Sequence, residues 1–290
     1  MLDLPFDPPI EQLSDSLFLD KGIEVFIKRE DLIHPFVSGN KWRKLKYVFR
    51  FAKENNIKQL VSFGGAYSNH LLALACAGAM YGFKTAAFVR GEEVSNHMLF
   101  MCKLWGMELY FVSREAYRNK HQLYDAKFSD DAQTMFIDEG GRGELAMKGC
   151  EEILEHIDKD FTHAICAVGT GTTLAGIAKR AAELNMHAEG ICVLKGAEDI
   201  DKDVERLIPN YTNWKVHHQF HRGGYAKTDK DLMAFIKTIA SGTGILLDQI
   251  YTAKMMMAVH ELVKQDYFKP RSKLLLIHTG GLSGLLSGGF

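Results

Sequence analysis

Two kinds of hydrophobic pattern alternate along this 290-residue chain: short apolar runs, and longer stretches with apolar residues at helical spacing. Short apolar runs rich in β-branched or aromatic residues predict strands at 24–28, 59–63, 85–89, 108–112, 134–137, 163–168, 190–194, 214–217 and 274–278. Stretches in which apolar residues recur at helical spacing predict helices at 40–53, 69–81, 96–105, 144–157, 172–184, 230–240 and 252–264. Strands that alternate with helices predict an α/β fold with a mostly parallel sheet.

The order of these elements also bears on the number of domains. A length of 290 residues suggests about two domains or one large one. Residues 47 to 139 form a compact series of strand and helix units, and the segments on either side can pair into a second, larger sheet. Such an inserted domain would leave a ligand cleft between the two parts. A head-to-tail arrangement of two domains fits the same element order equally well.

Four of the predicted strands end in paired or nearly paired glycines. These sequences are SFGG at 62–65, DEGG at 138–141, VGTG at 168–171 and HTGG at 278–281. Ligands bind beyond the carboxyl ends of the strands in open α/β sheets, and glycine lets the backbone come close to a ligand. One such pair is typical of an ordinary turn, whereas four together indicate a shared binding site.

The loop formed by Gly169, Thr170, Gly171, Thr172 and Thr173 is the best candidate for a phosphate site. It joins the strand HAICAV to the helix TTLAGIAKRAAEL, so backbone N–H groups and the positive end of the helix point at the loop. Threonine hydroxyls add further donors. The chain has no G-x-x-x-x-G-K-[ST] sequence, and a leucine follows Thr173 where a dinucleotide fingerprint requires glycine. The loop therefore favours a phosphate over NAD.

A second candidate is the basic segment SGNKWRKLK at 38–46, which begins a predicted helix. Lys41 and Lys44 are three residues apart, so they project to the same side. Most basic runs are solvated surface. A lysine that forms a Schiff base needs an unprotonated amine, however, and burial beside a cation such as Lys44 or Arg43 lowers its pKa. We therefore regard Lys41 as a candidate nucleophile, with Gly39 leaving room for a flat ring.

The turn GGAYSNH at 64–70 follows a predicted strand and opens the next helix. Ser68 and Asn69 stand at cap positions, and simple helix capping is the ordinary interpretation of such residues. The functional interpretation places a substrate carboxylate on the N–H groups of this helix start. Asn69 would then bond a ring hydroxyl, and Ser68 would be free to handle a proton.

Composition narrows the class of protein. Hydrophobic residues make up 47% of the chain, and 35 basic against 36 acidic residues give a net charge of −1. Dominant disorder and broad attraction to nucleic acid or an anionic membrane are therefore not expected. No segment reaches the roughly 18 apolar residues that span a bilayer, and the first residues lack a signal-peptide pattern. Five scattered cysteines without C-x-x-C are typical of buried free thiols, so we expect a cytoplasmic protein.

The sequence HHQFH at 217–221 raises the question of a metal site. Adjacent histidines on a strand point to opposite faces, which leaves only His218 and His221 to cooperate. No carboxylate motif accompanies them. We therefore expect no metal.

Taken together and in order, these motifs resemble the fold-type II pyridoxal-phosphate enzymes. Within them, the chain is similar to the family of 1-aminocyclopropane-1-carboxylate deaminase and D-cysteine desulfhydrase. The matching stretches are IKREDL, SGNKWRKLKY, SFGGAYSNH, DEGGRGELAMKG, VGTGTTLAG and IHTGG, with the tyrosine pair Tyr225 and Tyr251. The resemblance implies a two-domain, three-layer αβα fold like that of the tryptophan synthase β-subunit. Its smaller domain, 47–139, would be inserted into a larger cofactor domain formed by 1–46 and 140–290, commonly in a homodimer.

The resemblance also implies roles for individual residues. Lys41 would hold pyridoxal 5'-phosphate as an aldimine, Lys44 and the loop 169–173 would bind its phosphate, and Asn69 would bond its ring hydroxyl. The substrate carboxylate would lie on Ser68, Asn69 and His70. Lys41 or Ser68 would act as the base, and the two matching tyrosines would bind or protonate the leaving group.

Two positions separate the branches of this family. Its deaminases carry glutamate after the tyrosine that matches Tyr251, and leucine in a late His-Leu-Gly-Gly. This chain has Thr252 and Thr279 instead, as in the desulfhydrase branch. We expect Thr279, with Thr252 second, to face the ring nitrogen, where a neutral hydroxyl suits a less developed carbanion than a carboxylate does.

The predicted function is therefore a pyridoxal-phosphate-dependent lyase that acts on a small amino acid. D-Cysteine desulfhydrase-like elimination to pyruvate, sulfide and ammonia is the first hypothesis. The alternatives are 1-aminocyclopropane-1-carboxylate deaminase and a cofactor-binding protein with little catalysis. One departure from the family pattern is that its usual glycine–tyrosine–glycine run is Gly224-Tyr225-Ala226 here.

Overall fold

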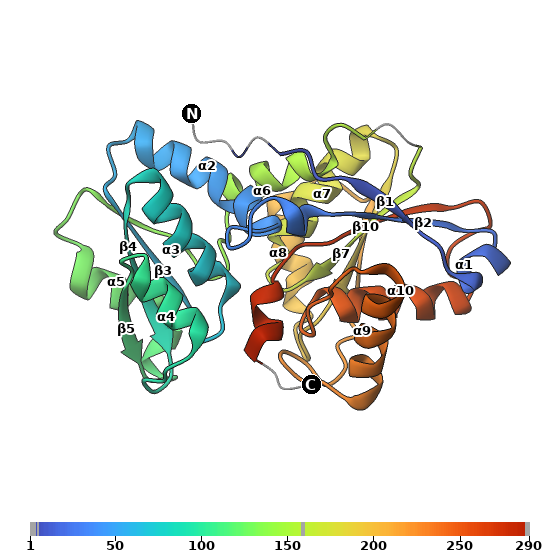
Figure 1. Ribbon diagram of the computed structural model, residues 1–290. Helices are drawn as coiled ribbons and strands as arrows, with labels where there is room; N and C mark the ends of the chain where they lie inside the picture. Colours follow the sequence, from blue (N-terminus) through green and yellow to red (C-terminus); the bar gives the residue numbers. More distant parts are fainter. Residues whose placement is uncertain (1–3, 5, 158–159, 288–290) are drawn as a thin grey trace.

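The structure is a computed structural model that describes residue 4, residues 6–157 and residues 160–287. The described strands form two separate sheets, with the smaller one on the left of Figure 1 and the larger one on the right. All neighbouring strands pair in parallel except β1 and β2. The six-stranded sheet has the order β1 (Ile10–Leu13), β2 (Glu24–Lys28), β10 (Lys273–Ile277), β7 (His163–Val168), β8 (His187–Cys192) and β9 (Trp214–His217). The four-stranded sheet has the order β5 (Glu108–Val112), β4 (Lys84–Arg90), β3 (Gln59–Gly65) and β6 (Thr134–Phe136).

Both faces of the larger sheet are covered by helices. Along β10, Leu274 and Leu276 belong to one hydrophobic cluster, whereas Leu275 and Ile277 belong to the cluster on the opposite face. This explains why the strand is apolar at every position. The first cluster contains residues of α1 (Ser16–Asp20), α9 (Lys230–Thr243) and α10 (Thr252–Lys264). The second contains residues of α6 (Glu144–Glu151), α7 (Thr172–Glu183) and α8 (Asp199–Leu207).

The smaller sheet is also a middle layer. Leu60 of β3 packs in a cluster with residues of three helices, and the next residue, Val61, packs on the other face. The three helices are α2 (Asn40–Glu54), α3 (Asn69–Tyr81) and α4 (His97–Leu104). On the other face lie α5 (Lys120–Phe128) and the 3₁₀ helix Ala116–Arg118. The predicted three-layer α/β fold is thus confirmed.

Most predicted elements are present, and several agree at both ends. These are the strands 24–28, 108–112, 163–168 and 214–217 and the helices 69–81 and 252–264. The helix predicted at 144–157 ends at Glu151 and is followed by the 3₁₀ helix Glu152–Leu154. Three helices and one strand escaped prediction: α1, α5, α8 and β1. Among them, α8 buries Ile200 and Val204.

The strand predicted at 190–194 is shifted, because β8 spans His187–Cys192. The observed strand includes Glu189, whose side chain is buried. The Glu189 carboxylate lies 2.8 Å from Nε2 of His217, and the Tyr267 hydroxyl donates to it at 3.2 Å. Partners distant in sequence therefore compensate a charged residue that the hydrophobic pattern excluded from the strand.

The domain boundaries at 46/47 and 139/140 stay a prediction. The smaller sheet is built only from strands between residues 59 and 136. The first boundary falls inside α2, whose residues Trp42, Leu45 and Val48 pack in the same cluster as Leu60 of the smaller sheet.

Two further expectations, one on the cysteines and one on membrane-spanning helices, can be compared with the structure. All five cysteines are buried and unpaired, as predicted. Within the described residues, no helix is both long and apolar enough to cross a membrane.

Candidate active site

The four glycine turns predicted to share a site meet around two connected cavities. An inner cavity of about 80 Å³ is lined by Gly140, Gly169, Gly171, Gly280 and Gly281, among others. An outer cleft of about 1470 Å³ is lined by Gly65 and by residues of both sheets' loops. The two cavities share the lining residues Lys41, Asn69, Gly140, Gly169, Thr170 and Tyr251. The predicted meeting of the glycine turns is thus confirmed.

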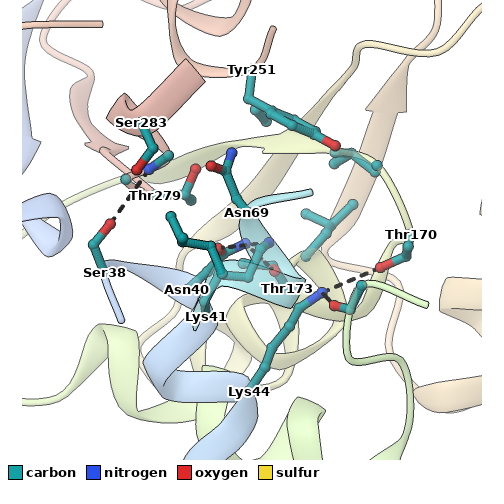
Figure 2. A pocket seen from close by; sticks show the side chains of 18 of the residues that line it. Ser38, Asn40, Lys41, Lys44, Asn69, Thr170, Thr173, Tyr251, Thr279 and Ser283 are labelled. Atoms are coloured by element: carbon teal, nitrogen blue, oxygen red, sulfur yellow. Dashed lines mark hydrogen bonds between the residues drawn. The ribbon is translucent and has the colours of Figure 1, made fainter. Parts of the chain in front are cut away.

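Lys41 lies at the junction of the two cavities, at the start of α2 (Figure 2). Its ammonium Nζ donates to Oδ1 of Asn40 at 3.1 Å, and Nδ2 of Asn40 donates to Oγ1 of Thr173 at 3.0 Å. Burial, reinforced by the nearby Lys44 charge, lowers the pKa of Lys41 to about 7. Much of this amine is therefore neutral at physiological pH, which is the state that attacks a carbonyl.

Lys44 is buried below the inner cavity. Its Nζ donates to the carbonyl of Gly140 at 2.9 Å and to the hydroxyl of Thr170 at 3.3 Å (Figure 2). The cation that acts on Lys41 is thus Lys44, as expected. The expectation that Arg43 also lowers the pKa of Lys41 is wrong. The Arg43 guanidinium instead pairs with Glu30 at 2.9 Å and with Glu152 at 3.3 Å.

Gly39 caps the start of α2 with a positive φ of 57°. A Cβ at this position would lie 2.0 Å from the carbonyl oxygen of Thr279. The glycine is therefore required by the close approach of two backbone segments. This differs from the expectation that it makes room for a flat ring.

The loop after β7 presents donors to the inner cavity. Gly169, Thr170, Gly171 and Thr173 line it, and Gly171 begins α7 with a φ of 76° and no side-chain cap. The N–H groups of the first turn of α7 therefore lack an intrahelical acceptor. Thr172 does not line the cavity, since it is buried with its hydroxyl 3.5 Å from that of Thr170. A contact between Thr172 and a phosphate would thus involve its backbone.

The turn before α3 combines capping with access to the cleft. The Ser68 hydroxyl accepts from the backbone N–H of Leu71 at 3.3 Å, so Ser68 is the N-cap. Asn69 lines both cavities (Figure 2). The N–H groups of Asn69 and His70 lie in the first turn, where no intrahelical acceptor exists. They remain suited to hold a carboxylate.

The imidazole of His70 is hydrogen-bonded to Ser62, so the predicted carboxylate contact of this residue would be made by its backbone N–H. Its Nε2 lies 2.8 Å from the Ser62 hydroxyl, which donates to the carbonyl of Ile137 at 2.8 Å. Because that hydroxyl has one hydrogen, Nε2 must be the donor to Ser62. Burial, with the charges of Lys41 and Lys44, holds the pKa of His70 well below its usual value. The ring is thus neutral and fixed, and only the backbone of His70 can hold a substrate carboxylate.

Tyr225 and Tyr251 form the wall of the outer cleft. Their rings meet edge to face with centroids 6.2 Å apart. Burial raises the pKa of both phenols, and that of Tyr251 lies well above its usual value. Both hydroxyls therefore keep their protons near neutral pH and can donate hydrogen bonds. A Cβ on Gly169 would lie 3.3 Å from the Tyr251 ring, so the phosphate loop and this tyrosine are in close contact.

Of the two threonines expected to face the ring nitrogen, only Thr279 lines the inner cavity (Figure 2). The expectation for Thr252 is wrong. This residue is fully buried, and its hydroxyl donates to Oδ1 of Asp248 at 2.8 Å. Asp248 also accepts from the backbone N–H groups of 250, 251 and 252 at 2.8 to 2.9 Å. Asp248, which the sequence did not single out, therefore shapes the start of α10 and the position of Tyr251.

The histidines of HHQFH contact different carboxylates. His217 lies 2.8 Å from Glu189, and His218 lies 2.8 Å from Asp201. Within the described part of the chain, no three His, Cys, Asp or Glu side chains are grouped to hold a metal ion.

The residues present fit a phosphorylated aldehyde cofactor. Its phosphate would lie among Lys44, Thr170, Thr173 and the start of α7, and its aldehyde would lie at Lys41. Asn69 offers an amide to a ring hydroxyl. No acidic side chain among the described residues lines the inner cavity, so nothing there repels a phosphate. The fold and site together define an enzyme that uses a phosphorylated cofactor at the carboxyl ends of parallel strands.

The chain belongs to the family described as pyridoxal-phosphate dependent enzyme, whose model matches residues 9–280. Its cofactor is therefore pyridoxal 5'-phosphate. A putative 1-aminocyclopropane-1-carboxylate deaminase of Thermotoga maritima is 31% identical over 308 aligned positions, covering 99% of this chain and 97% of that protein. A D-cysteine desulfhydrase of Klebsiella pneumoniae is 27% identical, covering 96% and 92%.

The fold has a solved counterpart as well. The crystal structure of an ACC deaminase homologue superposes with a TM-score of 0.85 at 24% identity, covering 97% of this chain and 91% of that one. These likenesses confirm the family that the motifs resemble. The roles of individual residues stay predictions.

Proposed function

We propose that the protein is a pyridoxal-phosphate-dependent lyase that eliminates the β-thiol of D-cysteine to give pyruvate, hydrogen sulfide and ammonia. The observation that carries the proposal is the absence of an acidic side chain among the described residues that line the inner cavity, where Thr279 provides a neutral hydroxyl. Thiolate is a good leaving group, so its elimination needs a weaker electron sink than opening a cyclopropane ring. The relatives named for each activity leave both reactions in the family's range.

When bound, pyridoxal phosphate supplies an aldehyde for amines and a ring that withdraws electrons from the substrate Cα. The chain's residues bind the substrate around it. The N–H groups of Asn69 and His70 at the start of α3 hold the substrate carboxylate. Ser68 caps the same helix start and also lines the outer cleft. Lys41 lines the same cleft, so its amine is available to the substrate Cα.

Proton transfer then follows from the pKa shifts. The Lys41 amine, with a pKa of about 7, accepts the proton from Cα. Tyr251 and Tyr225 keep their protons near neutral pH, because burial raises the pKa of each phenol, so their hydroxyls can donate hydrogen bonds to the departing sulfur. Water finally replaces the amine, so that D-cysteine and water give pyruvate, ammonia and hydrogen sulfide.

The decisive experiment measures products from the purified protein with D-cysteine and, separately, with 1-aminocyclopropane-1-carboxylate. We expect sulfide, pyruvate and ammonia from D-cysteine, with the L-enantiomer as the stereochemical control. Ammonia from the cyclopropane substrate without sulfide from D-cysteine would establish the deaminase instead. Cofactor absorbance without any product across a panel of D- and L-amino acids would indicate a cofactor-binding protein with little catalysis.

Lys41→Ala is the variant that tests the site. It should lose turnover and the visible absorbance of lysine-bound cofactor, because it removes the amine that lies at the junction of the two cavities. Full turnover by Lys41→Ala would refute the assignment. The homodimer that the family resemblance implies is checked on the same preparation by light scattering.

A further inference from the structure

Lys254, on the first turn of α10, has no role in the site described so far. It is only 1% exposed. Its ammonium donates to two backbone carbonyls, that of His221 at 3.0 Å and that of Gly224 at 2.7 Å. A buried ammonium is tolerated only where it is hydrogen-bonded, and these two bonds join the start of α10 to the loop that contains both carbonyls.

That loop has an unusual backbone. Arg222, Gly223, Gly224 and Ala226 all have positive φ values, of 46°, 85°, 105° and 55°. L-residues disfavour this region because Cβ approaches the following carbonyl. Ala226 stands where the related family usually has glycine, so this chain holds a side chain in a conformation that glycine adopts more easily. Such a conformation persists only when its surroundings impose it.

The residue enclosed by these positions is Tyr225. Tyr225 as a whole is 44% exposed, so packing holds only part of this residue. Within the loop, the Gly224 N–H donates to the His221 carbonyl at 3.0 Å and the Lys227 N–H donates to the Gly224 carbonyl at 3.2 Å. These are the same two carbonyls that accept from Lys254. The ammonium therefore stabilises both turns that flank the tyrosine.

Lys254 also connects the loop to the other tyrosine of the cleft. Tyr251 immediately precedes α10, and Lys254 is three residues further along. The two rings meet edge to face with centroids 6.2 Å apart. One ring comes from the loop and the other from the start of α10, and Lys254 connects these two segments. We propose that Lys254 is a positioning residue, which sets Tyr225 against Tyr251 by hydrogen bonding the carbonyls of His221 and Gly224. The expected effect on turnover rests on the proposed function of Tyr225. The expected effect on the conformation of the loop does not.

Hydrogen exchange of the cofactor-loaded protein tests the structural part. Lys254→Met keeps the length of the side chain but removes its donors. We expect exchange at the amides of 222–227 to accelerate about tenfold or more, with α7 unchanged, because a locally held loop opens without global unfolding. Lys264→Met, at the exposed end of the same helix, is the matched control and should exchange like the wild type. Wild-type exchange at 222–227 in Lys254→Met would overturn the proposal.

Kinetics test the catalytic part. Lys254→Met should lower kcat for D-cysteine to nearly the level of Tyr225→Phe, and should have little further effect in a Tyr225→Phe background. Equal fold-losses in both backgrounds would show that Lys254 does not act through Tyr225. If Tyr225→Phe turns over like the wild type, the proposed role of the tyrosine fails while the exchange result still decides the role of Lys254.

A second variant guards against misfolding of Lys254→Met. Lys254→Gln keeps an NH₂ donor at nearly the same depth, and its exchange at 222–227 should lie between those of the wild type and of Lys254→Met. Adding Ala226→Gly to Lys254→Gln should slow that exchange again, because glycine relieves the left-handed position. No slowing in the double variant would contradict the strain that the proposal assigns to this loop.

Discussion

Lys44 lies one helical turn beyond Lys41 on α2, and the charge of the first lowers the pKa of the second. Lys44 cannot turn away, because its Nζ donates to the carbonyl of Gly140 at 2.9 Å. Together with burial, this fixed cation brings the pKa of Lys41 from 10.5 to about 7. The charge of Lys44 thus has two effects. It favours a bound phosphate, and it keeps the amine of Lys41 reactive.

The pH dependence of cofactor uptake follows from this pair. The neutral amine is the attacking form, and a lowered pKa means that Lys41 is half neutral at about pH 7. Cofactor-free protein should therefore bind pyridoxal phosphate at a rate that rises with pH and levels off a little above 7. Stopped-flow absorbance measures this rate. A rate that keeps rising toward pH 10 would show that Lys41 titrates like an ordinary lysine.

Lys44→Met tests the cause of the shift. Removing the neighbouring cation should move the midpoint of uptake to higher pH, and should also weaken cofactor binding because a phosphate partner is lost. Arg50→Met is the control, since Arg50 is an exposed cation on the same helix. Its midpoint should equal that of the wild type. An unchanged midpoint in Lys44→Met would leave burial as the sole cause.

Thr252 and Thr279 should respond differently to the same substitution. Thr252→Val removes the hydrogen bonds that its hydroxyl makes with Asp248, which should lower the free energy of unfolding by about 1–2 kcal/mol. The absorbance of the bound cofactor should not change, because the Thr252 side chain does not line the cavity. Thr279→Val should alter that absorbance and its pH dependence. Chemical unfolding and visible spectra separate the two, and a spectral change confined to Thr252→Val would reverse the assignment.

Local patterns in the sequence were sufficient to predict that these segments meet at one place. The segments around Lys41, Ser68 and Gly169 each begin a helix after a strand or turn, and those signals lie within a few residues of one another. The parallel sheets then bring the carboxyl ends of the strands together. Their meeting could therefore be predicted without knowing any side-chain contact.

Other features depend on partners that the sequence does not reveal. Asp248 precedes α10 in an irregular loop, where an aspartate is common, and its importance appears only when its four donors are seen. Thr252 was misplaced for the same reason, because a family motif gives its position but not the direction of its hydroxyl. Glu189 was excluded from a strand because its partners His217 and Tyr267 are far along the chain.

Glycine positions show most sharply how tertiary contact decides the effect of one added methyl group. A Cβ on Gly149 of α6 would lie 1.8 Å from the carbonyl oxygen of Arg43 on α2, because the two helices cross backbone to backbone there. Gly149→Ala must therefore separate α6 from the helix that carries Lys41 and Lys44. We expect a loss of about 3 kcal/mol or more in the free energy of unfolding, and weaker cofactor binding because the two lysines move.

Gly242→Ala is the matched control for that substitution. Gly242 lies in α9, its φ is not positive, and a Cβ there would meet no atom within 4 Å. Alanine should therefore raise the free energy of unfolding by about 0.5–1 kcal/mol, since it lowers the entropy of the unfolded chain and favours the helix. Chemical unfolding of both variants gives the comparison, and cofactor titration should be unchanged for Gly242→Ala alone. Equal stability of Gly149→Ala and wild type would mean that α6 and α2 do not cross this closely.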